Sequence, residues 1–67
     1  MNLVNLLSHF KYVDRIVLCI PEEVNIKTYI YEFEFGYLDY IDRFVDHWFL
    51  DMDDIEGLTL HVNLCVK

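Results

Sequence analysis

The last ten residues alternate between apolar and mostly polar side chains, and this pattern constrains the fold more than any other part of the chain. One set of positions holds Leu58, Leu60, Val62, Leu64 and Val66, and the other holds Thr59, His61, Asn63, Cys65 and Lys67. Because successive side chains of a strand point to opposite faces, this segment predicts a half-buried strand with one wet face. Such a strand needs a sheet to pair with and a layer that covers its apolar face.

Two earlier segments predict an antiparallel hairpin. Residues 13–20 alternate in a similar way, and residues 25–35 are rich in β-branched and aromatic side chains. Pro21 lies between them and cannot continue a central ladder, so it marks a short turn. An aromatic row on the second strand is expected to lie in the core beneath the helices, with part of it exposed as a dimer surface. It consists of Tyr29, Tyr31, Phe33 and Phe35.

Two other segments show helical spacing. Residues 2–11 carry an apolar stripe at i, i+3, i+4 and i+7, and Asn2 can cap the helix. From Tyr37 to about Asp46 a second amphipathic helix is predicted, with one aromatic face and one acidic face. Residues 48–52 give a short third strand. The order α-β-β-α-β-β predicts a single small α+β domain over residues 1–67, with a four-stranded, mostly antiparallel sheet and two short helices on one face.

The charge of the chain is strongly negative. Twelve acidic residues face five basic ones, for a formal charge of −7. Phosphates would repel such a chain, which argues against direct binding to nucleic acid and favours a partner with a basic surface. Nine acids lie between residues 32 and 56, with Arg43 as the only base among them, and these are the candidate partner-binding residues: Glu32, Glu34, Asp39, Asp42, Asp46, Asp51, Asp53, Asp54 and Glu56. Because like charges at helical spacing cost stability, their concentration favours a binding role over solubility alone.

Neither a metal site nor a cofactor is expected. The acidic stretch FLDMDDIEG resembles a calcium loop only in composition. If Asp51 is loop position 1, Ile55 stands at position 5, where an oxygen ligand is needed, and Gly57 comes one residue after position 6, where the loop needs glycine. A hairpin loop closed by Gly57 explains the stretch better, and weak calcium binding is the third alternative. A zinc site would need ligands gathered at one point, but His61 and Cys65 would lie about 13 Å apart along one strand. Cys19 can approach one of them only if the first and last strands are neighbours.

The sequence does not predict an enzyme. It contains no glycine-rich phosphate loop and no GxSxG motif, and a chain of 67 residues has little room for a concave pocket. Charged and polar residues interrupt the first twenty positions, so neither a signal peptide nor a membrane span is expected. The two cysteines form no CxxC motif and are expected to be reduced. These features predict a soluble, cytoplasmic protein that binds no membrane.

In organisation the chain resembles small acidic proteins from phages and other mobile elements of Gram-positive bacteria. Those proteins open on a short MNxxxLL-type helix, here MNLVNLL, followed by a β-hairpin and acidic elements. The resemblance extends to the anti-CRISPR inhibitors that imitate DNA. It implies a non-enzymatic inhibitor in the cytoplasm of a bacterial host, which occupies a basic, nucleic-acid-binding surface such as that of an RNA-guided nuclease. The alternative is a small structural or assembly module that acts as a homodimer.

Overall fold

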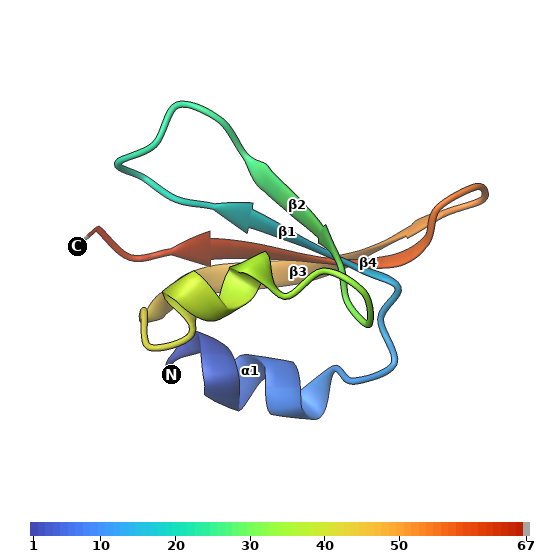
Figure 1. Cartoon of the computed structure of the whole chain (residues 1–67), viewed down its shortest axis with the longest axis horizontal. Coiled ribbons are helices and arrows are strands. Elements are labelled where there is room, and N and C mark those ends of the chain that lie inside the picture. The colour runs from blue at the N-terminus through green and yellow to red at the C-terminus, as the bar shows by residue number, and fades with distance from the viewer. Residues whose placement is uncertain (67) are drawn as a thin grey trace.

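The computed structural model describes residues 1–66 as a four-stranded mixed sheet with one α-helix and one 3-10 helix (Figure 1). In chain order the elements are α1 (Leu3–His9), β1 (Arg15–Cys19), β2 (Lys27–Ile30), η1 (Gly36–Tyr40), β3 (Val45–Asp53) and β4 (Gly57–Leu64). The strand order is β2-β1-β4-β3. Both outer pairs are antiparallel hairpins, and the central pair β1–β4 is parallel. The predicted α+β class, the four strands and both hairpins are confirmed.

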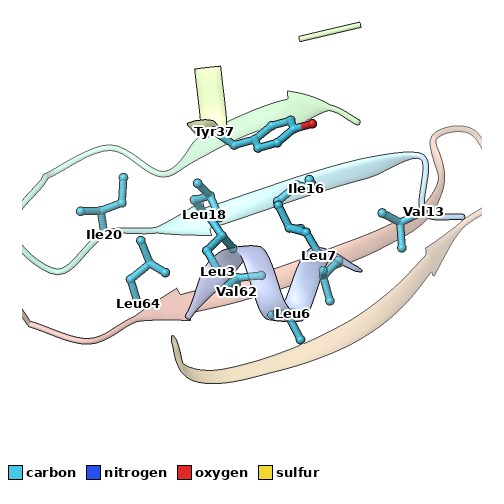
Figure 2. Packing of buried hydrophobic residues seen from close by; sticks show 11 residues of the cluster. Leu3, Leu6, Leu7, Val13, Ile16, Leu18, Ile20, Tyr37, Val62 and Leu64 are labelled. Atoms are coloured by element: carbon cyan, nitrogen blue, oxygen red, sulfur yellow. The ribbon is translucent and has the colours of Figure 1, made fainter. Parts of the chain in front are cut away.

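The core lies between one face of the sheet and the two helices (Figure 2). From the sheet it takes the alternate residues Ile16, Leu18 and Ile20 of β1 and its extension, and Leu60, Val62 and Leu64 of β4. From the other layer it takes Leu3, Leu6 and Leu7 of α1, together with Tyr37 of η1. The period-2 and period-3.6 patterns of the sequence therefore meet at one interface. The opposite face of the sheet, which we call the open face, has no helix over it within residues 1–66.

The first helix begins where the sequence predicts. The Asn2 side chain accepts a hydrogen bond from the Asn5 N–H at 3.0 Å and satisfies one of the free donors of the first turn. The Phe10 N–H donates to the Leu7 carbonyl at the other end. Among residues 1–66 there is no helix long and apolar enough to cross a membrane.

Replacing Asn2 by alanine removes this cap and is expected to lower the free energy of unfolding by about 1 kcal/mol. Asn2→Asp keeps an acceptor at the same place and is expected to have a smaller effect, so it serves as the matched control. Urea denaturation followed by circular dichroism compares the three proteins. Equal loss in both variants would show that the side-chain acceptor is not what stabilises the helix.

The predicted second helix is wrong over most of its length. Only Gly36–Tyr40 is helical, as a 3-10 helix, and from Val45 the chain is already in β3. The segment from Val45 pairs with β4 as far as Asp53, which satisfies backbone groups that a helix would otherwise bond within itself. Only Val45, Trp48 and Phe49 of this stretch favour strands by themselves, so it is the pairing with β4, and not local propensity, that overrides the helical spacing. The third strand is therefore longer than the expected residues 48–52.

The predicted aromatic strand is shorter than expected. β2 ends at Ile30, directly opposite Arg15, the first residue of β1. The Tyr31 N–H still donates to the Asp14 carbonyl, but no partner strand continues beyond it among residues 1–66, and the Phe33 and Glu34 N–H groups donate back to the Ile30 carbonyl in a turn. The rings of Tyr29 and Tyr31 pack around Tyr37 at centroid distances of 6.0 Å. Tyr29 and Tyr31 thus lie against the core and Phe33 and Phe35 are exposed, which agrees with the expected core row with one exposed part; its role as a dimer surface stays a prediction.

Candidate acidic binding surface

Four of the nine candidate acids lie on a projecting hairpin. β1 begins opposite Thr59, so the part of the β3–β4 hairpin that precedes this row extends beyond β1 (Figure 1). We call residues 51–57 the acidic arm. All of its four carboxylates are exposed, and they belong to Asp51, Asp53, Asp54 and Glu56. The predicted hairpin between the last two strands is present, but its loop is shorter than FLDMDDIEG: only residues 54–56 form the loop, because residues 49–53 belong to β3 and Gly57 begins β4.

The tip of the acidic arm is held by backbone geometry and by one aspartate. Gly57 has φ of +86°, the left-handed region that favours glycine. Asp53 Oδ1 accepts hydrogen bonds from the Ile55 N–H at 2.7 Å and the Glu56 N–H at 2.9 Å. Asp53 therefore shapes the turn as well as carrying charge, a role that the sequence analysis did not foresee.

The base of the acidic arm is tied to β1. Arg15 forms an ion pair with Glu56, and its Nε donates to Thr59 Oγ1 at 3.1 Å. The Asp14 carboxylate accepts a hydrogen bond from the Leu58 N–H at 2.8 Å. The arm is thus anchored at its root, while its tip extends into solvent.

The structure does not gather all nine acids at one place. Glu32 lies in the turn after β2 and, with Glu56, lines a cavity of about 400 Å³ beside the root of the arm. Glu34 and Asp39 lie near Tyr29. The pKa of Tyr29 is raised mainly by burial, and the negative charges of these two carboxylates raise it further, whereas Lys27 lowers it. Asp42 and Asp46 lie near the opposite end of β3, which is about 26 Å long from Val45 to Asp53.

The expectation that three acids share one helix face is therefore wrong. Asp39 is in η1, Asp42 is in the following turn, and Asp46 is at the bulge near the start of β3. Arg43, the base between them, points away to other partners. It forms an ion pair with Glu22 and donates to the Cys65 carbonyl at 2.8 Å, and the hydrogen bond to Glu22 raises its pKa. Arg43 thus joins the β1–β2 loop to the end of β4.

The histidines and cysteines do not form a metal centre. Among residues 1–66 no three His, Cys, Asp or Glu side chains come together where they could hold a metal ion. β1 and β4 are neighbours, so Cys19 and His61 line one small cavity on the open face. Nothing in the described part of the chain hydrogen-bonds the Cys19 thiol to His61, whose ring stacks on Phe49 with centroids 4.4 Å apart.

Sequence reasoning missed the apolar residues that accompany these acids. Ile55 is 92% exposed at the tip of the arm, and Met52 is 66% exposed beside it. The signal that could have drawn attention to this place is Ile55 at a turn flanked by acids, because turns are dominated by Gly, Pro, Asn, Asp and Ser. Comparison of the chain with family models, with curated proteins and with solved structures gives no match.

Proposed function

We propose that this chain is a non-enzymatic binding module that docks its acidic arm on a basic, nucleic-acid-binding surface of a partner protein in the bacterial cytoplasm. The observation that carries the proposal is the projecting arm itself, with four exposed carboxylates and an exposed Ile55 at its tip. Among residues 1–66 a lysine or arginine pairs with only one of the nine candidate acids, Glu56. Of the other eight carboxylates, Asp53 accepts two backbone hydrogen bonds, and Asp46 and Asp51 lie beside His47 and His61. The remaining five form no hydrogen bond or ion pair within residues 1–66 and can attract the cations of a partner: Glu32, Glu34, Asp39, Asp42 and Asp54.

The shape of the arm supports insertion into a groove. Its turn is shaped by Asp53 and Gly57 and its root is anchored by Asp14 and Arg15, so little ordering is needed on binding. The carboxylates would meet lysine and arginine side chains that ordinarily bind phosphates, and Ile55 would add an apolar contact. A basic channel of an RNA-guided nuclease has this chemistry, and such nucleases are the first partners to test.

Displacement of DNA from the partner provides the test. The protein is titrated into a complex between a guide-loaded nuclease and a fluorescent DNA duplex, and anisotropy reports release of the DNA. We expect release that weakens steeply between about 0.1 and 0.4 M salt, because exposed charges are screened. Failure to displace DNA from any member of a panel of such nucleases would contradict the proposed nucleic-acid mimicry.

Two charge-neutralising pairs locate the binding surface. Glu32→Gln with Asp54→Asn changes the end that carries the arm, and Asp39→Asn with Asp42→Asn removes the same charge elsewhere. None of these four side chains makes a hydrogen bond or ion pair within residues 1–66. We expect the first pair to weaken binding by roughly two- to tenfold and the second to leave it almost unchanged. Equal effects would show that only net charge matters.

The homodimeric assembly module is the second candidate function. The specific observation in its favour is the free outer edge of β3, which bears exposed apolar side chains. Weak calcium binding has no comparable support, since Asp53 Oδ1 is already occupied by two backbone N–H groups.

A further inference from the structure

β3 is a long edge strand with an open outer side. It stands last in the order β2-β1-β4-β3. Within residues 1–66 its outer side is paired only at its start, where Asn2 forms an isolated bridge with Phe44 and the Val45 N–H donates to the Met1 carbonyl. Beyond the bulge near Val45, residues 47–53 pair regularly with β4 and leave their other side free. Such an edge is a template for another strand unless short length, proline, charged side chains, a bulge or a covering segment blocks it. β3 contains neither proline nor lysine, its bulge lies before residue 47, and residues 48–50 carry no charge. The other edge strand, β2, has only four residues and carries Lys27.

The register shows which backbone groups of β3 are free. The Leu58 carbonyl accepts a hydrogen bond from Asp14 on the β1 side, so even-numbered residues of β4 face β1 and odd-numbered residues face β3. The odd-numbered residues of β4 pair with odd-numbered residues of β3. The N–H and C=O groups that point away from the sheet therefore belong to Trp48, Leu50 and Met52.

The side chains of the same three residues form an apolar row. They pair with Val62, Leu60 and Leu58, so they lie on the face of the sheet that carries α1. The helix does not cover them fully, because Trp48 is 41%, Leu50 39% and Met52 66% exposed. Phe49, on the open face, is 49% exposed. The edge thus combines unpaired backbone groups with apolar surface on both faces, which is the combination that a second strand would cover.

We propose that β3 pairs antiparallel with β3 of a second copy of this chain, about a two-fold axis through Leu50. Leu50 is the midpoint of the regular free segment 47–53. In this register Leu50 lies opposite the partner copy's Leu50, and Trp48 opposite the partner copy's Met52. Each of these pairs exchanges two backbone hydrogen bonds, so every outward-pointing group of the three residues is satisfied. The two sheets become one, with both α1 helices on the same face.

The charges of the strand fit the same arrangement. Its only basic side chain, His47, lies opposite the partner copy's Asp53, and this contact occurs twice by symmetry. Within its own chain His47 is 3.0 Å from Asp46, and both side chains are exposed. Sliding one strand by two residues moves the axis by one residue. With the axis at Asp51, the two Asp51 side chains would face each other and Trp48 would lie opposite Asp54. With the axis at Phe49, Met52 would lie opposite Asp46 at the bulge. The register centred on Leu50 pairs apolar with apolar residues along the whole row.

Sedimentation equilibrium of the full chain tests association. We expect a monomer–dimer equilibrium at high micromolar concentration, which His47→Lys strengthens and His47→Asp weakens by roughly tenfold, because the two cross-strand pairs with Asp53 have opposite charges in the lysine variant and like charges in the aspartate variant. Thermal melting followed by circular dichroism checks that both variants fold. A strict monomer would overturn the proposal, and so would a dimer whose dissociation constant is the same in His47→Lys and His47→Asp.

Cysteine cross-linking tests the register independently. In a background with Cys19→Ser and Cys65→Ser, Leu50→Cys is expected to form a disulfide dimer under mild oxidation, since the Cα atoms of a hydrogen-bonded antiparallel pair lie about 5.5 Å apart, a separation that a disulfide can span. Met52→Cys is the matched control: its two copies would lie about 13 Å apart along the strands and should not cross-link. Efficient cross-linking through Met52→Cys, or none through Leu50→Cys, would overturn the pairing. Neither test uses the residues varied to locate the acidic surface, so each proposal can fail without the other.

Discussion

Leu60→Ala is expected to remove most or all of the stability of the domain. Leu60 is fully buried at the centre of β4, between β1 and β3 and beneath the helices. Truncating a buried leucine to alanine costs about 2–5 kcal/mol, because the lost transfer free energy adds to a cavity. A core of this size supplies only roughly 3–5 kcal/mol. The variant should therefore show a large loss of circular dichroism signal at 25 °C, or a urea midpoint near zero.

Leu38→Ala is the matched control for this prediction. Leu38 is 52% exposed on η1, outside the core cluster, and its truncation should change the free energy of unfolding by no more than about 0.5 kcal/mol. If Leu60→Ala unfolds at the same urea concentration as Leu38→Ala, the buried cluster does not sit where we place it.

Gly57→Ala is expected to cost about 2–5 kcal/mol. The left-handed conformation of Gly57 is unfavourable for alanine by about 1–2 kcal/mol. A Cβ atom there would also collide with the Asp14 carboxylate, which accepts the hydrogen bond from Leu58. Displacing that carboxylate leaves the Leu58 N–H with a poorer partner, which adds about 1–3 kcal/mol. Chemical denaturation measures the total.

Two comparisons separate the contributions to this loss. Gly36→Ala introduces a methyl group against the Tyr29 ring without a positive φ, so it should cost less than Gly57→Ala. Combining Asp14→Ala with Gly57→Ala removes the collision, so the double variant should lose less than the sum of the single ones. Strict additivity would mean that Asp14 and Gly57 do not interact.

The elements that could be predicted are those with a local signal. The alternation from Leu58 to Leu64 and the stripe with its Asn2 cap depend on period and on one side-chain hydrogen bond, and both are found in the structure. The hairpins follow from short turns between strand-like segments, and Gly57 marks the second of them. Local patterns decide which face of each element is buried, so most of the core residues could be predicted from the sequence.

What could not be predicted depends on distant partners. The segment around Trp48 fits helical spacing and also strand alternation, and only its pairing with β4 decides between them. Because the segment forms a strand, Asp39, Asp42 and Asp46 do not share one helix face but lie in a 3-10 helix, a turn and a strand, respectively. The acidic arm, in contrast, was foreseen as a hairpin loop because its sequence contains its own turn residues. Its projection beyond the sheet depends on where β1 begins, which no local pattern specifies.

The parallel pairing at the centre of the sheet also governs how the chain reaches its native state. Arg15 and Thr59, neighbours across that pair, are 44 positions apart in the sequence. The β1–β2 and β3–β4 hairpins close short loops and can form within microseconds, but joining them requires the entropy of a long loop to be lost first. Non-local pairings of this kind slow folding. During synthesis α1 and the first hairpin emerge without the strand that buries them, so the domain should fold only after β4 has left the ribosome, and until then its apolar surfaces remain open to chaperones.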